Sequence, residues 1–398
     1  MHKDLSVQPL PRTAADDVDV LKSLRRRSLA EQYKYIVARL GVVYYSGVLK
    51  MIRFGPAGIP LSCKGRTLKD GIEDVHNLGL TAIEIPMVRA GTVDHYPEEE
   101  EIGLCIEELK DGLVVELIRD DIPICDPKEP IEEDDILVMM ASGVADSYGS
   151  LIPIGNMARR LDVKVSLHTP YYMDLGSNNE LTERCMNNIR HSGIITNALG
   201  GGVVVTNLGL YNDPTNTEET DANIIENVEA VMEWWKDAGI KTELGIEITG
   251  RQEAFGSLEQ VLSLCDDIKG TVPVINFPHH HARTSGSLLA ASDFADIIDQ
   301  VRPYCKNGVH TLFSGVEHND GNEKRLTPIK KGDLKFEPLG EALADIDHDL
   351  TVISGSPLLE HDAMYMKVIH ERVLTKRVVK AMRAKKKDEA STADEEEE

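Results

Sequence analysis

The chain has 398 residues, 41% hydrophobic and 28% charged, which suits either two to three domains or one α/β barrel with additions, and excludes a chain disordered throughout. Its 43 basic and 67 acidic side chains give a net charge of −24. That charge opposes non-specific nucleic-acid binding, although a local basic patch is compatible with it.

The two ends of the chain differ from its middle. Residues 1–20 are polar and predict a mobile arm, and residues 21–40 have the apolar spacing of a helix. Residues 365–386 predict a basic helix, followed by the acidic tail 388–398. We therefore expect an N-terminal arm and helix (1–50), a central domain (51–370), and a C-terminal basic helix end with an acidic tail (371–398).

Short apolar runs rich in Val and Ile alternate with helix-length segments through the central domain. Because these runs are continuous, they predict strands buried on both faces, as in a parallel sheet. Eight of them, each followed by a helix, predict a (β/α)8 barrel, with a doubly wound open sheet as the alternative. No G-x-G-x-x-G follows a strand, which weighs against dinucleotide binding. The runs are 51–54, 81–85, 163–167, 202–206, 243–248, 272–276, 309–313 and 350–354.

A gap of about 80 residues separates the second run from the third. Residues 92–145 fill it with two acidic runs, several prolines and short apolar segments, which predict a β-rich insertion. The βα loops of a barrel open at its C-terminal face, where active sites lie. We therefore expect the insertion to cover or reshape the mouth of the site, or to contact a protein partner.

Cysteine usage and hydropathy bear on where the protein works. The six cysteines are far apart and include no C-x-x-C pair, which is typical of reduced thiols in an intracellular protein. No run of about 18 apolar residues predicts a membrane span, and the N-terminus lacks the apolar run of a secretory signal. We expect a cytoplasmic protein that does not contact membranes.

Polar side chains follow the C-terminal ends of the predicted strands. His168, Asn207 and Glu247 follow the third, fourth and fifth runs, and Asn276 and His279 follow the sixth. In a barrel these ends converge on one face, where His168, Glu247 and His279 are suited to hold a zinc-like ion. Each group taken alone is more typical of a hydrogen-bonded strand end.

The histidine run 279–281 is less specific than its composition suggests. In an extended or turn conformation adjacent residues point in different directions. At most His279 and His281 then share a face.

Several segments resemble the endonuclease IV family (AP endonuclease family 2) of xylose isomerase-like TIM barrels, and its archaeal members most. The resemblance spans roughly residues 50–370, interrupted by 92–145. It implies a trinuclear zinc site at the barrel mouth that cleaves DNA 5′ to an abasic site during DNA repair. The matching segments are IRFGPAGIPLSCKGRT (52–67), GLTAIEIPMVR (79–89), VSLHTPYYMDL (165–175), LGLYND (208–213), FGSLEQ (255–260), INFPHHHAR (275–283), LFSGVEH (312–318), EKR (323–325) and SPLLEHDA (356–363).

The resemblance implies nine metal ligands, of which this chain keeps three: His168, Glu247 and His279. Amides stand at two further positions, Asn207 and Asn276, and amides are poor zinc ligands. Three zinc ions need about nine to twelve ligand contacts, so we expect at most one zinc or other divalent ion and no three-zinc site. The remaining family positions carry Leu312, Lys324, Leu326 and Gly355, and a shifted alignment of 309–326 would offer His310, His318 and Asp320 instead.

Two functions remain open. In the first, the chain is a pseudoenzyme with a degenerate zinc site and weak or no phosphodiesterase activity, which acts as a binding or scaffold protein. In the second, one divalent ion and the catalytic carboxylate Glu247 serve an AP-site endonuclease or phosphodiesterase, or a sugar isomerase or epimerase. The net charge favours a small substrate, such as a phosphorylated molecule, over abasic-site DNA.

Side chains near the predicted mouth suggest how a ligand is held. An arginine fork binds two phosphate oxygens, and Arg283 is one candidate, with a salt bridge to a loop carboxylate as its alternative role. The adjacent side chains of Tyr171 and Tyr172 are suited either to stack on a sugar or base of the ligand or to pack within a loop. The predicted substrate-binding residues are Arg283, Tyr171, Tyr172, Arg251, Arg325, Asn207 and Asn276.

Overall fold

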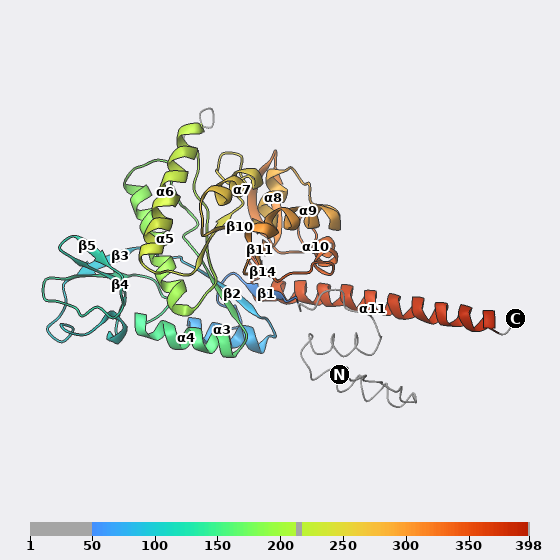
Figure 1. Ribbon diagram of the computed structural model, residues 1–398, viewed down its shortest axis with the longest axis horizontal. Coiled ribbons are helices and arrows are strands. Elements are labelled where there is room, and N and C mark those ends of the chain that lie inside the picture. The colour runs from blue at the N-terminus through green and yellow to red at the C-terminus, as the bar shows by residue number, and fades with distance from the viewer. Residues whose placement is uncertain (1–49, 212–216, 397–398) are drawn as a thin grey trace, which may run out of the picture. The chain divides into compact units, whose positions relative to one another are not determined.

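Eight parallel strands form a barrel in the computed structural model, which describes residues 50–211 and 217–396, with side chains to 384 (Figure 1). They are β1 (Ile52–Pro56), β2 (Ala82–Pro86), β7 (Lys164–His168), β8 (Val203–Thr206), β9 (Glu243–Glu247), β10 (Thr271–Asn276), β11 (Val309–Phe313) and β14 (Leu350–Ser354). Their order is β1-β14-β11-β10-β9-β8-β7-β2. All eight predicted runs are therefore strands, and the predicted barrel is confirmed.

The seam between β1 and β2 completes the ring with few contacts. The Thr81 backbone N–H donates to the Phe54 carbonyl oxygen (3.0 Å), and one parallel bridge joins Ala57 to Glu84. Gly55 lies at this seam, where a Cβ would stand 1.7 Å from the carbonyl oxygen of Ala82. The two strands approach this closely only because the residue has no side chain.

Helices cover the outside of the barrel (Figure 1). Local sequence sets their ends, as in α5, where the Asn179 side chain accepts from the backbone N–H of Leu181 and Thr182 and Gly200 ends the helix in the left-handed region. The helices are α3 (Leu68–Asn77), α4 (Tyr148–Arg160), α5 (Glu180–Leu199), α6 (Glu218–Asp237), α7 (Leu258–Asp267), α8 (Phe277–Arg283), α9 (Ala291–Val301), α10 (Phe336–Leu343) and α11 (Glu360–Glu396), with 3-10 turns η1 (Ile106–Glu108) and η2 (Arg302–Tyr304).

Alternate residues of the strands form two hydrophobic layers. One set packs outward against the helices and belongs to the main core. The other set fills the barrel interior with small and branched side chains, as expected for a packed barrel. This inner cluster consists of Ala82, Val203, Val205, Val272, Val274, Leu312 and Ile353.

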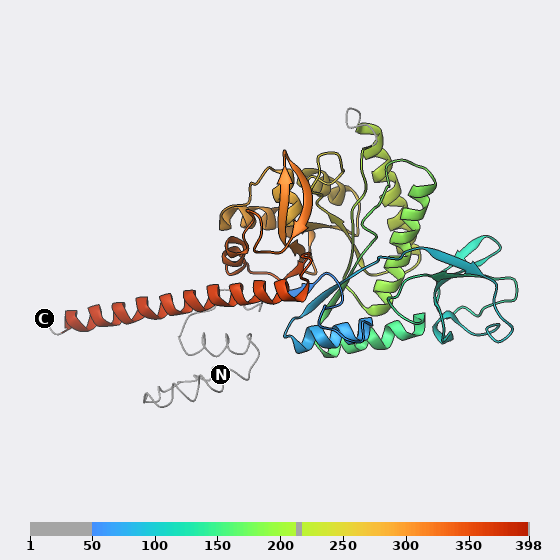
Figure 2. The ribbon, with the colours of Figure 1, turned by 180° about the vertical axis from the view of Figure 1, so that it is seen from behind.

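The insertion is β-rich, as predicted, and leaves the barrel at the end of β2. Its antiparallel sheet has the order β3-β6-β4-β5. The sheet packs against α4 and α5, where the Glu116 carboxylate lies 3.0 Å from Nε2 of buried His191 (Figure 2). The expectation that it covers the site mouth is therefore wrong, because its apolar face is used against these helices. The strands are β3 (Thr92–His95), β4 (Leu113–Arg119), β5 (Ile122–Ile124) and β6 (Ile136–Met140).

Asp135→Asn is expected to loosen the insertion. The buried Asp135 carboxylate accepts from Nε and Nη2 of Arg119 and from the Glu132 N–H, each at 2.8 Å, and the Arg119 hydrogen bonds hold its pKa below the usual value. The variant should lower the thermal midpoint by about 2–4 °C. Its exposed neighbour supplies the control, Asp134→Asn, which should change nothing.

The effect of Asp135→Asn should depend on pH in one direction. A carboxylate with a lowered folded-state pKa stabilises the fold above its unfolded pKa of about 3.9 and loses that contribution as the pH falls. The difference from wild type should therefore be constant above about pH 5 and shrink below it. Calorimetric scans from about pH 3 to about pH 7 measure this, and a difference that grows on acidification contradicts the ion-pair explanation.

The ends of the chain and the cysteines complete the fold. The predicted arm and helix of residues 1–49 lie outside the described residues, and α11 continues past the basic segment into the acidic one, to Glu396. All six cysteines lie in the described part and are free. Among the described helices, none combines the length and the apolar character of a membrane span.

Candidate functional site

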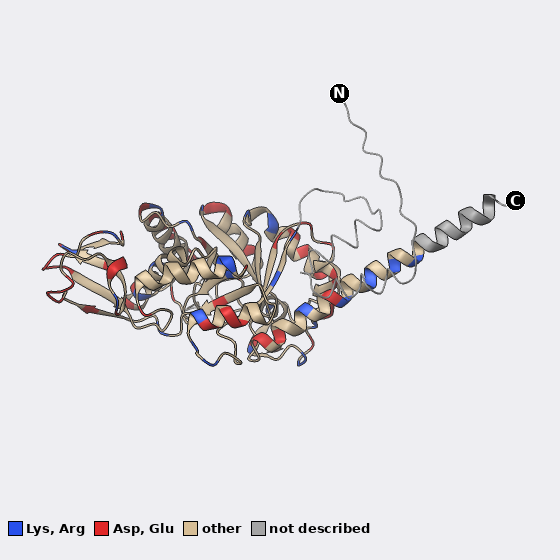
Figure 3. Cartoon of the chain, turned by 90° about the horizontal axis from the view of Figure 1, so that it is seen from below, with Lys and Arg blue, Asp and Glu red and all other residues tan. Residues whose placement is uncertain are grey.

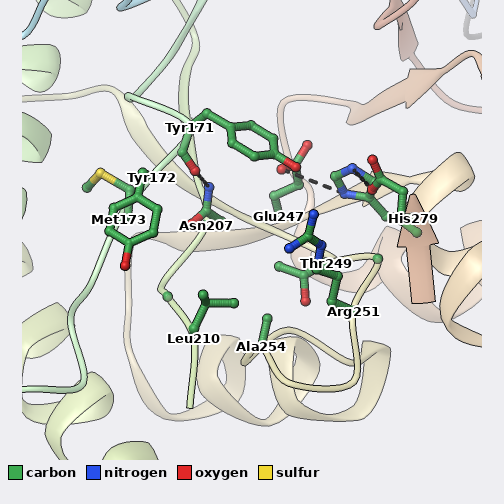
Figure 4. Close-up of a pocket in the computed structure, with 13 residues that line it drawn as sticks. Tyr171, Tyr172, Met173, Asn207, Leu210, Glu247, Thr249, Arg251, Ala254 and His279 are labelled. Carbon is green, nitrogen blue, oxygen red and sulfur yellow. Dashed lines mark hydrogen bonds and ion pairs between the residues drawn. The ribbon is translucent and has the colours of Figure 1, made fainter. Parts of the chain in front are cut away.

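A pocket of about 120 Å³ opens at the C-terminal ends of β7, β8 and β9 (Figure 4). Six of the residues predicted from the sequence line it: Tyr171, Tyr172, Asn207, Glu247, Arg251 and His279. No residue of the insertion does so. The barrel thus brings most of the predicted site residues to one place, because the strand ends that carry them are neighbours in the sheet.

Glu247 is the centre of the site. It ends β9 and is 3% exposed. One carboxylate oxygen accepts from Nδ2 of Asn276 (2.9 Å), and the other lies 3.5 Å from Nε2 of His168 and 4.0 Å from Nδ1 of His279. These contacts satisfy a carboxylate that would otherwise be costly to bury.

His279 enters the site from a helix and not from an extended segment. Asn276 caps α8 by accepting from the His279 backbone N–H, and Pro278 occupies the first turn, where its missing N–H costs nothing. The expectation of an extended or turn conformation for 279–281 is therefore wrong. The helical spacing directs His279 to Glu247 and Glu323, and His281 elsewhere.

The buried charges shift one another's pKa values. Burial acts to lower the pKa of His168, but the hydrogen bond and charge of Glu247 outweigh it and raise the pKa to about 9. Burial acts to raise the pKa of Glu247, but His168, His279 and the Asn276 amide lower it to about 2. The pKa of His279 is also raised, because the Glu323 carboxylate 2.9 Å from its Nε2 outweighs burial.

The backbone fixes which nitrogen of each imidazole is free. Nδ1 of His168 donates to the Thr169 carbonyl (2.8 Å), and Nδ1 of His279 donates to the Ile248 carbonyl (3.0 Å). A carbonyl only accepts, so both neutral rings carry their proton on Nδ1 and present an Nε2 lone pair. This is the tautomer that binds metal, with the backbone acting as the outer partner.

Two His–carboxylate pairs have the spacing of neighbouring metal ligands. Zinc–ligand bonds of about 2.0–2.2 Å place neighbouring donor atoms about 3.0–3.5 Å apart. The pairs His168–Glu247 (3.5 Å) and His279–Glu323 (2.9 Å) are spaced in this way, and each places an Nε2 atom beside a carboxylate oxygen. The two pairs stand apart, because among the described residues only His281, His318 and Asp333 bring three ligand atoms within 4.8 Å of one another.

The resemblance to the endonuclease IV family implies further metal ligands at several positions. In this chain those positions carry other residues. Leu312 belongs to the inner apolar cluster, and a Cβ on Gly355 would meet the side chain of Leu326 at 3.6 Å. Lys324 is exposed on the β12–β13 hairpin (β12 Gly315–Asn319, β13 Asn322–Thr327). Apolar packing thus replaces metal ligands on that side of the mouth.

A second cluster, His281, His318 and Asp333, places three ligand atoms within 4.8 Å of one another. The Leu288 backbone N–H donates to Nδ1 of His281 (3.1 Å), so the neutral ring carries its proton on Nε2, the nitrogen that faces Asp333 at 3.4 Å. His281 therefore offers an N–H to Asp333 and no lone pair to an ion. The cluster is suited to hydrogen bonding between α8, the hairpin and the loop that carries Asp333.

The predicted phosphate-binding arginines are mostly engaged elsewhere. Nη1 of Arg283 donates to Thr249 Oγ1 (3.3 Å), to the Ala254 carbonyl (3.2 Å) and to the Arg251 carbonyl, so it holds the loop after β9. Arg325 forms a two-pronged ion pair with Glu317, both at 2.8 Å, across the hairpin. Only Arg251 of the three lines the pocket.

The rim of the pocket is aromatic. Tyr171 and Tyr172 are 68% and 62% exposed, and the Asn207 side chain donates to the Tyr171 carbonyl (2.8 Å), which holds their loop in place (Figure 4). Exposed rings at a polar pocket suit a sugar or base face. This hydrogen bond uses one of the two N–H groups of the Asn207 amide, and Asn207 lines the pocket, so its contact with a ligand stays a prediction.

Sequence reasoning missed Glu323 and Glu84. Glu323 lines the pocket from β13, a hairpin whose position no strand pattern predicts. Glu84 is buried inside β2 and accepts a hydrogen bond from Nε2 of His310 (2.7 Å). The residues offered as substitute ligands, His310, His318 and Asp320, do not line the pocket. An acidic residue in the middle of an apolar run, AIEIP, was the available signal for Glu84.

The fold and the site define a class: a (β/α)8 barrel with buried imidazoles and carboxylates at its C-terminal mouth. Residues 144–361, more than half of the chain, match the family described as xylose isomerase-like TIM barrel, and the chain belongs to this family. It is 29% identical over 213 residues to an uncharacterized protein of Methanocaldococcus jannaschii, a match that covers 52% of this chain and 76% of the relative.

Solved structures of low sequence identity share the fold. Endonuclease IV from Thermus thermophilus matches with a TM-score of 0.51 and 15% identity, over 81% of this chain and 99% of that one. The apo form of 3-keto-D-glucoside 4-epimerase from E. coli matches with a TM-score of 0.51 and 10% identity, over 81% and 100%. At these identities the likeness shows the fold alone.

Proposed function

We propose that the protein is an enzyme that binds one divalent ion through His168, Glu247, His279 and Glu323 and transfers protons on a small polyhydroxylated substrate of the sugar class. The observation that carries the proposal is the pair of imidazoles whose Nδ1 protons are held by carbonyls, so that Nε2 of each ring faces a carboxylate oxygen and can bind an ion once its proton is released. Buried charged groups cost desolvation, and groups with shifted pKa values at a pocket are candidates for a functional role.

Charge and pocket size support a small substrate over DNA. Arg283 and Arg325, which would have bound a phosphate backbone, are used within the fold. Acidic residues are spread over the barrel helices and the insertion, and the net charge is −24 (Figure 3). A pocket of about 120 Å³ with a tyrosine rim suits a sugar ring or chain, stacked on its C–H face.

The residues divide the chemistry between them. A bound divalent ion supplies Lewis-acid polarisation of a carbonyl or hydroxyl oxygen. Glu247, with its pKa of about 2, remains ionised and is a weak proton acceptor. We therefore assign it the role of stabilising positive charge in the site. Glu323 lines the pocket beside His279 and is assigned to accept the proton from carbon next to a carbonyl. Tyr171 positions the substrate and shields the site from water.

Solvent exchange tests the proposal even while the product is unidentified. The protein with Mn²⁺ is incubated with a panel of ketoses and aldoses in D₂O, and NMR follows deuterium entry at carbon next to the carbonyl. We expect exchange for at least one sugar, its loss in Glu323→Gln and Glu247→Gln, and no change in His318→Ala, which alters the other histidine cluster.

The same protein is tested on a duplex with one abasic site, with and without chelator. Cleavage that is lost in Glu247→Gln, without sugar exchange, would establish the phosphodiesterase alternative instead. Absence of both reactions in protein that does bind an ion would support a non-catalytic binding protein.

A further inference from the structure

A second cavity lies outside the barrel, between the outer face of β2 and the two stems of the insertion. We define the stems as residues 86–91 and 141–145, which are joined by a hydrogen bond from the Ala141 N–H to the Gly91 carbonyl (2.8 Å). The loop after β1 and Leu359 close the other sides. The volume of about 630 Å³ is in the range of small-molecule sites.

The walls of the cavity are apolar. Ile83 and Ile85 contribute the outer face of β2, and Met87 and Val144 contribute the two stems. These four side chains are at most 8% exposed. Because they belong to the barrel and to both stems, a molecule that fills this space contacts three separate segments. The remaining apolar lining residues are Ala57, Ile59, Leu68, Pro86, Val88 and Leu359.

The charges of the cavity are opposite to those of the chain. Arg66 and Arg89 line it and no Asp or Glu does, in a protein with a net charge of −24. The Arg66 side chain makes one hydrogen bond, from Nη1 to the Pro60 carbonyl (3.1 Å), and Arg89 has no hydrogen bond or ion pair with a described residue. Most of the donors of both planar guanidinium groups are therefore available to an oxyanion.

Two further features are explained by a ligand. The Oγ of Ser142, on the second stem, is buried and lacks a hydrogen-bond partner among the described residues. Arg66 has a φ of +59°, a left-handed conformation that costs energy for a residue with a side chain. An unpaired hydroxyl and a strained arginine at the same cavity both indicate a site shaped for something other than packing.

We propose that this cavity binds an amphipathic oxyanion, a molecule with an apolar body and a phosphate, sulfate or carboxylate group. The body lies against Ile85 and Val144, and the oxyanion binds Arg66 and Arg89. The Ser142 hydroxyl donates a further hydrogen bond. Such a ligand joins the barrel wall to both stems and holds the insertion in one orientation.

Titration calorimetry with 1-naphthyl phosphate tests the site, since the probe combines an aromatic body with a phosphate. We expect one binding site per chain, and binding at least tenfold weaker for 1-naphthol or inorganic phosphate alone. Comparison with 1-naphthoate then shows whether phosphate or carboxylate is the preferred head group. Arg89→Gln should weaken binding at least tenfold, and Val144→Trp, which fills the cavity, should do the same.

The control is Arg325→Gln, which removes an exposed arginine outside the cavity and should leave the affinity unchanged. Hydrogen exchange provides a second readout: the probe should slow exchange in 86–91 and 141–145 and leave the loop 248–257 unaffected. Absence of binding overturns the proposal, as does binding that is equal in Arg89→Gln and Arg325→Gln or that protects the loop 248–257 in place of the stems.

Discussion

Glu247→Gln is expected to abolish tight binding of a divalent ion, with an affinity loss of more than about 100-fold for Mn²⁺ or Zn²⁺. The substitution keeps the shape of the side chain and removes the charge that faces both His168 and His279. Calorimetry and metal analysis of the purified protein measure the effect, with about one ion per wild-type chain as the expected value.

Two matched variants sharpen this experiment. Asn276→Ser retains a side chain that caps α8 and removes the amide that donates to Glu247, so we expect a loss of about 10–100-fold. His318→Ala should have no effect, because the tautomer of His281 opposes a metal at the other cluster. Three ions per chain, or a loss in His318→Ala that equals that in Glu247→Gln, would contradict our assignment.

Gly55→Ala is expected to destabilise the barrel by about 3–5 kcal/mol. The new Cβ would stand 1.7 Å from the Ala82 carbonyl oxygen, a backbone atom that cannot move without opening the seam between β1 and β2. Urea unfolding followed by tryptophan fluorescence measures the loss. Gly91→Ala is the control, since its Cβ meets nothing within 4 Å; equal stabilities of the two variants would contradict the packing argument.

The barrel was predictable because its strands are encoded locally. Each of the eight runs is mostly apolar, and burial on both faces of a parallel strand favours that pattern wherever the strand lies. The same logic located His168 and Glu247, since a polar residue that ends such a run must lie at the sheet edge. Helix α8 was not foreseen, although Asn276 before a proline is a helix start in its own right.

The remaining features depend on contacts between segments that are distant in sequence. Arg283 was a reasonable phosphate ligand from its position, but carbonyl groups of the loop after β9 surround it. Glu323 reaches His279 because the hairpin folds back over the mouth, which nothing in its own sequence indicates. The packing of the insertion similarly rests on His191 of α5, which lies 75 positions from Glu116.

The hydrogen bond between the two stems explains how the barrel tolerates so long an insertion. The chain leaves the ring near Gly91 and returns at Ala141, and these two residues are hydrogen-bonded to each other. The two ends of the excursion are therefore as close together as those of a short loop. The entropic cost of ordering the intervening residues is offset by contacts within their own sheet and not by the barrel. Strand pairing on either side of the excursion is then insensitive to its length, so this loop can be lengthened or shortened without altering the ring.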